Sequence, residues 1–472
     1  MADGTLSLSA NFENATEADW LAAVDKALKG GGIERITRRT RDDIAIRPLY
    51  RETDFESGQD LRGTPGAAPF LRGANSEPDP YLQWDIRQSF SHPDPRVTNE
   101  EILRDLERGV TSINLAIECS GERGCIITDI AGLKTALSGV RADIATVSLA
   151  HRGAGSGASA AALLAIWAEG HDTPSTQKLA FNISTTRQLM LNGKIAGGID
   201  AAMARTAALV KVLAAKFPAA TGLAIDGQFP HEAGGSEAQE LGVLIADAVD
   251  TMRRLDMAGL PPEESAKQLV FKLAIDANYG IGIAKLRAAR RLWARVQEVM
   301  GLPVEPMNIH AITSARMLTR YDAWVNMLRG TAACFAAATG GADIITVRAF
   351  NEAFTVPEEL GRRIARNTQI MAMEVSGLGR VADPSGGAWF SETLAEDLAT
   401  AAWAEFQTIE SEGGLVESLV AGKIQARIAQ KRGMLMKDVS RRKVPITCVS
   451  EFQLLDEVDP PDADVKAPPP GN

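Results

Sequence analysis

The side chains best suited to catalysis are histidines near the ends of apolar runs. His151, His231 and His310 each stand at or shortly after such a run. An imidazole changes its charge near neutral pH, so it can act as a general acid, a general base or a metal ligand. For His310 we expect a core histidine with internal partners. His151, followed by Arg152, could contact an anion or close a loop.

Other reactive side chains lack the neighbours that their chemistry needs. Cys119 follows Glu118, but nothing in the sequence marks a base that would activate its thiol. The glycine-rich stretch 153–157 lacks the Lys-Ser/Thr ending of a phosphate-binding loop, and we interpret it as a flexible loop. No Cys-x-x-Cys pair and no His/Cys group with zinc spacing occurs, which predicts reduced cysteines and no metal site. The cysteines are Cys119, Cys125, Cys334 and Cys448.

Charge and hydropathy restrict the partners of the chain. The 472 residues carry a formal net charge of −10, which argues against binding nucleic acid through its phosphates. No window approaches the roughly 18 apolar residues of a membrane span. The N-terminus has no basic region followed by an apolar core, as a signal peptide would. We therefore expect a cytoplasmic protein with no membrane or nucleic-acid partner.

From about residue 100, short β-branched runs alternate with amphipathic or alanine-rich stretches. This order predicts parallel strands with helices outside them. The number of repeats favours an α/β fold of the closed (β/α)8 TIM-barrel type over a doubly wound open sheet, although periodicity alone does not separate the two. The predicted strands cover residues 113–117, 144–149, 179–183, 223–225, 307–312 and 344–347.

Residues 1–85 do not repeat this pattern and predict an N-terminal arm that docks on another subunit. Thr16 and Asp19 fit a capping box at a helix start. Apolar residues then recur at helical spacing, and they are Trp20, Leu21, Val24 and Leu28. After three glycines the segment becomes extended and irregular, which is typical of functional or docking segments.

The rest of the chain divides into two parts. Residues 86–455 are predicted to form the barrel domain, and residues 456–472 a disordered tail rich in acids and proline. Within the barrel, residues 284–296 predict an amphipathic outer helix with five basic residues opposite its apolar face. That charge could meet an anionic ligand, but we interpret it as a solvated helix face.

Six sequence phrases occur together, in order, along residues 40–390. They are DIAIRPLY at 43–50, PGAAPFLRG at 65–73, WDIRQ at 84–88, KLRAARRLW at 285–293, RIARNTQ at 363–369 and RVADP at 380–384. Together they resemble the methylmalonyl-CoA mutase family, in particular its small, β-type subunits without a cobalamin-binding domain. The resemblance implies a TIM barrel whose CoA-threading axis is lined by small and polar side chains. It also implies an arm that reaches a partner subunit.

The resemblance also implies which residues a catalytic subunit would need, and several are replaced. The family places a Tyr directly after W-x-IRQ, and here that residue is Ser89. A family His that hydrogen-bonds the thioester carbonyl is replaced by Phe229, and the Tyr before it by Gln228. Phe cannot donate a hydrogen bond to a carbonyl. His231, two residues later, could take over this role after a backbone shift.

Two further positions depart from the family in the same direction. A Glu that faces the adenosyl ribose is replaced by Val375, and a polar Gln by Ile312. Apolar replacements avoid burying polar groups without partners. Arg72 in PGAAPFLRG and Arg87 in WDIRQ remain as candidate contacts to CoA, because guanidinium groups bind phosphates well.

Cobalt in the family takes its lower ligand from a D-x-H-x-x-G loop. Here only His231 is followed by x-x-Gly, and the residue two positions before it is Phe229 instead of Asp. Too few residues remain after Asp456 to build a cobalamin domain. We therefore expect neither cobalamin nor any other cofactor, no metal and no catalytic residue on this chain.

These expectations leave three hypotheses for the function. In the first, the chain is a non-catalytic small subunit of a heteromeric mutase, and a larger partner holds adenosylcobalamin and interconverts methylmalonyl-CoA and succinyl-CoA. In the second, it is the catalytic barrel of a related acyl-CoA mutase whose cobalamin domain is a separate chain. In the third, it is a non-enzymatic docking or cofactor-loading scaffold. Binding of an acyl-CoA in the barrel stays open.

Overall fold

The computed structural model describes residues 15–55, 63–118, 124–151, 155, 157–171 and 173–457. Cys119 and Arg152 lie outside these residues, as do most of the glycine-rich stretch 153–157 and residues 458–472 of the predicted tail. Residues 1–14 of the predicted arm lie outside them as well.

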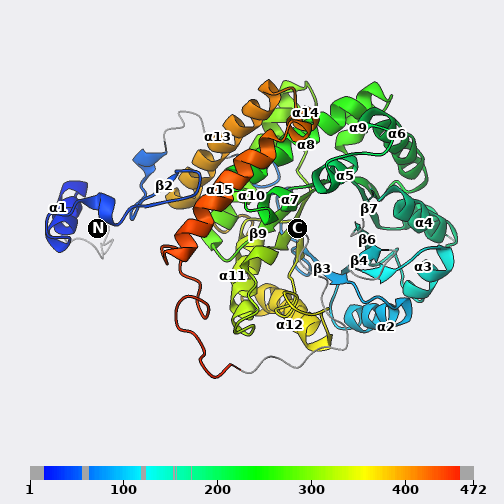
Figure 1. Ribbon diagram of the computed structural model, residues 1–472, viewed down its shortest axis with the longest axis horizontal. Helices are drawn as coiled ribbons and strands as arrows, with labels where there is room; N and C mark the ends of the chain where they lie inside the picture. Colours follow the sequence, from blue (N-terminus) through cyan, green and yellow to red (C-terminus); the bar gives the residue numbers. More distant parts are fainter. Residues whose placement is uncertain are drawn as a thin grey trace, which may run out of the picture.

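Eight parallel strands of the described chain close into a barrel surrounded by helices (Figure 1). The first barrel strand pairs with the last and with the second, which closes the sheet. A further short strand, β5 (Cys125–Ile126), pairs with one barrel strand at its end. The predicted TIM barrel is confirmed, and the open-sheet alternative is wrong. The barrel strands are β3 (Asp85–Phe90), β4 (Ser112–Glu118), β6 (Thr146–His151), β7 (Leu179–Ile183), β8 (Thr221–Asp226), β9 (Leu269–Ile275), β10 (Ile309–Thr313) and β11 (Ile344–Thr346).

Six of these strands coincide with the predicted runs, and two were not predicted. β9 is a continuous buried run with Lys272 at its centre. A lysine in a buried run conflicts with ordinary strand patterns, because a charged group is rarely buried without a specific partner. β3 was seen only as part of the WDIRQ phrase, whose Arg and Gln hide its strand character.

Small and polar side chains line the inside of the barrel. Successive strand residues point to opposite faces, so in β4 Ser112 and Asn114 face inward while Ile113 and Leu115 pack against the helices. Ser148 of β6 donates a hydrogen bond to Asn114, its partner on the adjacent strand β4 (3.2 Å). These positions agree with the small and polar lining that the family resemblance implied, whereas Arg87, Lys272 and His310, also buried in the barrel, are larger.

The helices form the outer layer and an additional layer on one side. α13 packs against both α8 and α10, so the last helices cover the barrel helices (Figure 1). None of the helices among the described residues is long and apolar enough to span a membrane. The helices of the barrel region are α2 (Pro95–Leu106), α3 (Ile130–Ala136), α4 (Ala158–Glu169), α5 (Thr185–Asn192), α6 (Ile199–Lys216), α7 (Gln228–Glu232), α8 (Glu237–Met257), α9 (Pro262–Ala266), α10 (Tyr279–Val299), α11 (Val325–Thr339), α12 (Glu359–Ile370), α13 (Trp389–Ser411), α14 (Leu415–Val420) and α15 (Lys423–Ser440).

The helix predicted at residues 284–296 is present, but the prediction that solvent surrounds its basic face is wrong. It is the central part of α10, and Lys285, Arg287 and Arg290 are buried. Arg287 donates to Glu392 (2.7 Å), and Lys285 donates to Glu240 (2.6 Å). The helical pattern was correct, but helices that follow much later in the chain cover its basic face.

The N-terminal arm begins with α1 (Glu17–Ala27), which has the predicted capping box at Thr16 and Asp19. None of its residues is buried, and the helix stands off the barrel (Figure 1). The arm continues through a short hairpin of β1 (Arg38–Arg39) and β2 (Ala45–Ile46). Asp42 in its turn accepts a hydrogen bond from the Ala238 N–H (3.0 Å), so the hairpin caps the N-terminus of α8.

Candidate functional site

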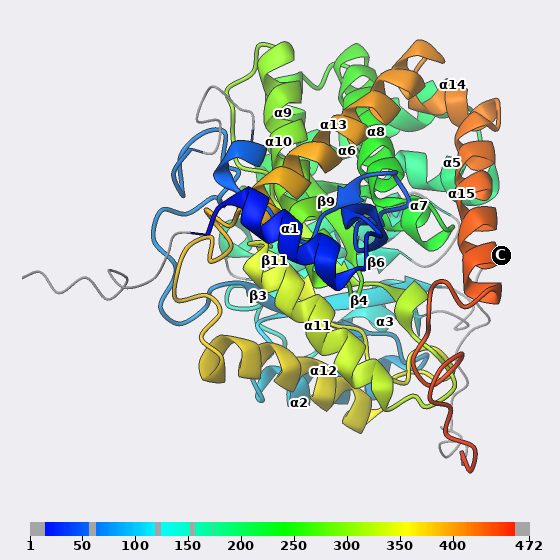
Figure 2. The ribbon, with the colours of Figure 1, turned by 90° about the vertical axis from the view of Figure 1, so that its left-hand side faces the viewer.

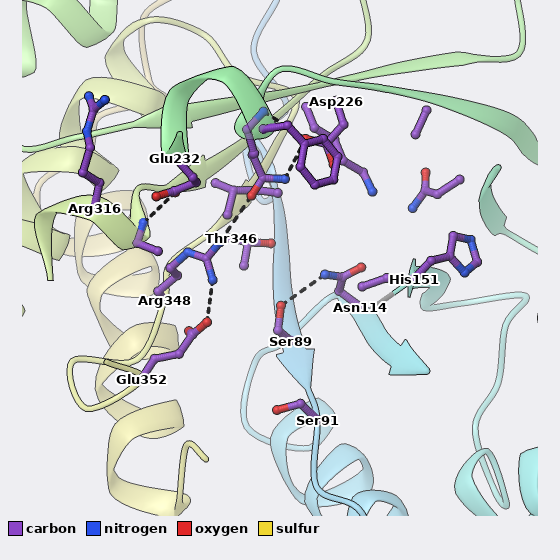
Figure 3. Close-up of a pocket in the computed structure, with 18 of the residues that line it drawn as sticks. Ser89, Ser91, Asn114, His151, Asp226, Glu232, Arg316, Thr346, Arg348 and Glu352 are labelled. Atoms are coloured by element: carbon purple, nitrogen blue, oxygen red, sulfur yellow. Dashed lines mark hydrogen bonds and ion pairs between the residues drawn. The ribbon is translucent and has the colours of Figure 1, made fainter. Parts of the chain in front are cut away.

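A cavity of about 640 Å³ opens at the end of the barrel where the strands terminate (Figure 3). Residues from all eight barrel strands and from the loops after them line it. The carboxyl ends of the strands are where TIM barrels carry their active sites. The cavity is therefore the candidate site, and we call it the mouth pocket.

Four of the five replaced family positions meet in the mouth pocket. Ser89, Gln228, Phe229 and Ile312 all line it, although they come from distant parts of the sequence. Ser89 lies near the end of β3, Ile312 near the end of β10, and the other two in α7 directly after β8. The sequence phrases thus identified one spatial site.

Short polar contacts fix the two polar members of this group. Asn114 Nδ2 donates to Ser89 Oγ (3.1 Å). Gln228 Nε2 donates to Asp226 Oδ1 (3.0 Å), and its Oε1 accepts from Arg348 (3.3 Å). Arg348 also pairs with Glu352 at 2.5 Å, as Figure 3 shows. These polar groups are satisfied within the protein.

The aromatic ring of Phe229 lies beside a cation. The guanidinium carbon of Arg187 is 5.3 Å from the centre of the ring. A cation over an aromatic face is attracted by the ring electrons, which holds both side chains in place. The side chain at the position of the family imidazole is therefore a packing element.

The fifth replaced position, Val375, is separated from the mouth pocket. It ends a π-helical turn, Met371–Val375, that follows α12, and its exposed fraction is 82%. Gly379, shortly after it, lies against Gln83, which precedes β3. Val375 is therefore close to the opposite end of the barrel, outside the site.

His231, the candidate substitute for the missing imidazole, is fully buried. Its Nδ1 lies 3.1 Å from Glu240 Oε2, and its Nε2 lies 2.8 Å from Ser314 Oγ. Lys285 donates to the same Glu240 oxygen (2.6 Å). His231 is not part of the pocket lining, and both ring nitrogens have internal partners. The arrangement suits a structural role.

Arg87 lies deeper in the barrel than the mouth pocket. It donates to Ser112 Oγ (2.8 Å) and to Asp85 Oδ2 (2.9 Å), and only 2% of its surface is exposed. His310, also buried, donates to or accepts from Thr346 at 2.8 Å. These side chains fill the barrel axis below the pocket.

Arg72, the other candidate CoA contact, faces acidic side chains. Its guanidinium lies 3.5 Å from both Asp383 and Glu392, the two carboxylates that also bind Arg287 of α10. In the same loop, Gly66 has φ +74°, and a Cβ there would collide with the backbone of Ser76. The PGAAPFLRG phrase therefore builds a compact loop tied to α10 and α13.

Burial lowers the pKa of His151 and of His310, which keeps these two imidazoles neutral. Burial lowers the pKa of His151 to about 4, against the opposing effect of the hydrogen bond to the Phe181 carbonyl (3.0 Å). Burial, together with the charges of Arg87 and Lys272, holds the pKa of His310 well below its usual range. His310 is buried in the core as expected, but among the described residues only its Nε2 has a hydrogen-bond partner and its Nδ1 has none. The ring of His151 bonds to the Phe181 carbonyl of β7, the strand beside its own.

Some residues of the site were not singled out from the sequence. Asn182 and Lys272 line the mouth pocket, and both interrupt apolar strand runs. Asn182 has φ +51°, which non-glycine residues seldom adopt, and donates to Ser148 Oγ (2.9 Å). A polar residue inside an otherwise apolar strand is the signal that could have identified them.

The site does not fit a corrin cofactor that needs a protein imidazole as its cobalt ligand. Of the described histidines, His151 lines the pocket but contacts the Phe181 carbonyl, while His231 and His310 are buried. No group of three or more His, Cys, Asp or Glu residues in the described parts of the chain could hold a metal ion. The pocket can accommodate a small polar molecule, and we derive no cobalamin chemistry from it.

The chain is similar in sequence to several known proteins. The profile of the family described as Methylmalonyl-CoA mutase matches residues 39–468. A methylmalonyl-CoA mutase small subunit from Streptomyces virginiae is 39% identical, with 100% of this chain and 76% of that protein covered. A small subunit from Propionibacterium freudenreichii subsp. shermanii is 34% identical, with 96% and 70% covered. The large subunit from Streptomyces virginiae is 29% identical, with 92% and 62% covered.

Proposed function

The chain belongs to the methylmalonyl-CoA mutase family, and from this premise we propose that it is a small, non-catalytic subunit of a heteromeric mutase. The family is one of adenosylcobalamin-dependent isomerases. In our proposal the larger partner holds the cofactor and interconverts methylmalonyl-CoA and succinyl-CoA. This chain contributes a barrel and an arm to the assembly.

The mouth pocket carries this proposal. By the family resemblance, Ser89, Phe229 and Ile312 replace a phenol, an imidazole and a polar amide of a catalytic subunit, and all three line this pocket. A hydroxymethyl group, a phenyl ring and an alkyl chain cannot position a thioester by hydrogen bonds as those groups do. All three replacements in one cavity are what we expect of a barrel that does not catalyse the reaction and serves in subunit assembly.

The closed barrel axis supports the same interpretation. Arg87, Ser112 and His310 are buried below the mouth pocket and bond to neighbouring strands. A long pantetheine arm would have to displace these groups and break their hydrogen bonds. Each buried polar group left without a partner costs about 1–3 kcal/mol. Threading of CoA through this barrel is therefore unfavourable.

The arm supports assembly with a partner. α1 presents Trp20, Leu21 and Val24 without burying any of them in its own barrel. Glu17 at its start pairs with Arg51, which links the helix to the next part of the arm. An amphipathic helix gains stability from packing its apolar face. The described part of the barrel offers the apolar face of α1 no surface to pack on, and in this proposal a second subunit supplies that surface.

The test measures mutase turnover for the isolated chain and for the chain co-expressed with the large subunit from the same organism. We expect no turnover with adenosylcobalamin and methylmalonyl-CoA for the isolated chain, and turnover for the copurified complex. In the complex, Ser89→Ala and Phe229→Leu should leave kcat within about twofold. Turnover by the isolated chain, or by the chain mixed with a separate cobalamin-binding protein, would contradict the proposal.

A further inference from the structure

Large apolar side chains follow one exposed face of α11. Trp324, Leu328 and Phe335 stand four and then seven residues apart, so they project from the same side of the helix. Their exposed fractions are 55%, 70% and 42%. Thr331, between the last two, lies on the same line and carries no charge. The face is therefore uncharged and mainly apolar, and the Thr331 hydroxyl on it donates to the Met327 carbonyl (2.8 Å).

Neighbouring aromatic rings extend this face and hold it in place. The ring of Tyr279, at the start of α10, lies 6.4 Å from that of Phe335 and is 56% exposed. Trp324 stacks on Phe350 with ring centres 5.0 Å apart. Aromatic side chains fixed before binding lose little conformational freedom on association, and they often dominate interface energies. We call Tyr279, Trp324, Leu328 and Phe335 the α11 stripe.

The α11 stripe lies on the flank of the barrel from which the arm projects. Figure 1 shows α1 standing off this flank, well apart from α11, and in Figure 2, which views the flank directly, α1 and α11 both face the viewer. The hairpin behind α1 is fixed to the barrel through Arg41, which donates to the Gly234 carbonyl (3.1 Å), and through Asp42. A subunit that packs on α1 is therefore brought to the flank that carries the stripe.

We propose that the large mutase subunit docks on the α11 stripe as well as on the arm. This inference rests on the proposed function, because it takes the partner from it. An apolar, uncharged face of three helical turns calls for an apolar surface on the partner, and the arm supplies a second contact beside it. Two linked contacts on one flank fix the orientation of the partner, which one projecting helix cannot do.

The test measures the dissociation constant between this chain and the large subunit. Leu328→Asp should weaken binding by roughly tenfold or more, because it places a charge in the centre of the contact. The matched control is Val420→Asp at the end of α14, where the wild-type side chain has the same exposed fraction of 70%. The control should bind within about twofold of wild type. Circular dichroism and the thermal midpoint establish that both variants are folded.

Hydrogen exchange of the α11 amides gives a second readout. Complex formation should slow exchange across residues 325–335. In the isolated chain, the exchange rate of these amides should not depend on the protein concentration. Equal binding by Leu328→Asp and wild type overturns the stripe proposal and leaves the proposed function intact. Absence of binding by the wild-type chain overturns the proposed function itself. Concentration-dependent protection in the isolated chain assigns the stripe to a second copy and also overturns the inference.

Discussion

His231 Nδ1 lies 3.1 Å from Glu240 Oε2 in a part of the barrel wall where both side chains are fully buried. Burial alone would raise the pKa of Glu240, but Lys285 and His231 together lower it, so the carboxylate stays ionised. Ser314 Oγ lies 2.8 Å from the other ring nitrogen of His231, Nε2. One imidazole thus joins α7, α8 and the end of β10.

His231→Ala should destabilise the protein by about 2–4 kcal/mol. The substitution removes a partner from buried Glu240 and from Ser314, and it leaves a small cavity. Urea denaturation of the purified chain measures this loss. His92→Gln, which changes a partly exposed histidine outside the cluster, should cost no more than about 0.5 kcal/mol. Similar stabilities for the two variants would show that the buried cluster contributes little.

The stability of the chain should decrease as the pH rises from about 4 to 7, because of Asp247. Burial raises the pKa of Asp247 to about 7; hydrogen bonds from Thr186 and Thr251 oppose the rise, and Asp250 and Asp226 add to it. An unfolded Asp titrates near about 3.9. Between the two values the folded state binds a proton that the unfolded chain has released, so a rise in pH favours unfolding.

Asp247→Asn removes this titration. The difference in unfolding free energy between pH 5 and pH 8 should shrink by about 3 kcal/mol relative to wild type, as follows from about 1.4 kcal/mol per pKa unit. Urea denaturation at several pH values measures the slope. Asp256→Asn, at an exposed position of the same helix, should follow the wild-type slope. An unchanged slope for Asp247→Asn would assign the pH dependence to other groups.

The Arg287 and Arg72 side chains share two carboxylates but should differ in their contribution to stability. Arg287 is 1% exposed and donates to Glu392 at 2.7 Å, whereas Arg72 is 20% exposed and lies 3.5 Å from Asp383 and Glu392. Removing one partner of a buried pair costs about 3–5 kcal/mol, and loosening an exposed pair about 1 kcal/mol or less. Arg287→Ala should therefore lower the urea midpoint much more than Arg72→Ala. Equal losses would indicate that the loop at 63–73 depends on Arg72 for its docking.

The sequence predicted the barrel and singled out a few residues of the pocket, because these depend on local patterns. Runs of β-branched residues marked six strands, and the family phrases brought Ser89, Gln228, Phe229 and Ile312 to one cavity. The surroundings of α10 were mistaken because α13, which follows much later in the sequence, packs on its basic face and because Lys285 pairs with Glu240 of the preceding helix α8. Burial of that kind depends on tertiary packing, which helical periodicity does not report.

The position of Val375 and the partners of His231 were beyond the sequence for a related reason. A π-helical turn after α12 leaves Val375 exposed near the start of β3. His231 lies only two residues from Phe229, but α7 is helical, so the two side chains point in different directions. His231 could take over the role of the missing imidazole only if residues two apart pointed to the same side, which holds on a strand and fails on a helix.

Arg87→Ala should destabilise the protein by about 2–4 kcal/mol. Arg87 is 2% exposed and pairs with Asp85 at 2.9 Å, so its removal leaves a carboxylate inside the barrel with only hydroxyl partners. Arg141 offers a matched control, because it pairs with Asp143, also two residues away, at 2.7 Å on the surface. Arg141→Ala should cost no more than about 0.5 kcal/mol. If Arg87 instead served to bind CoA, Arg87→Ala would leave the unfolding free energy measured in urea near that of the wild type. It would then weaken the binding of acyl-CoA, which calorimetry measures.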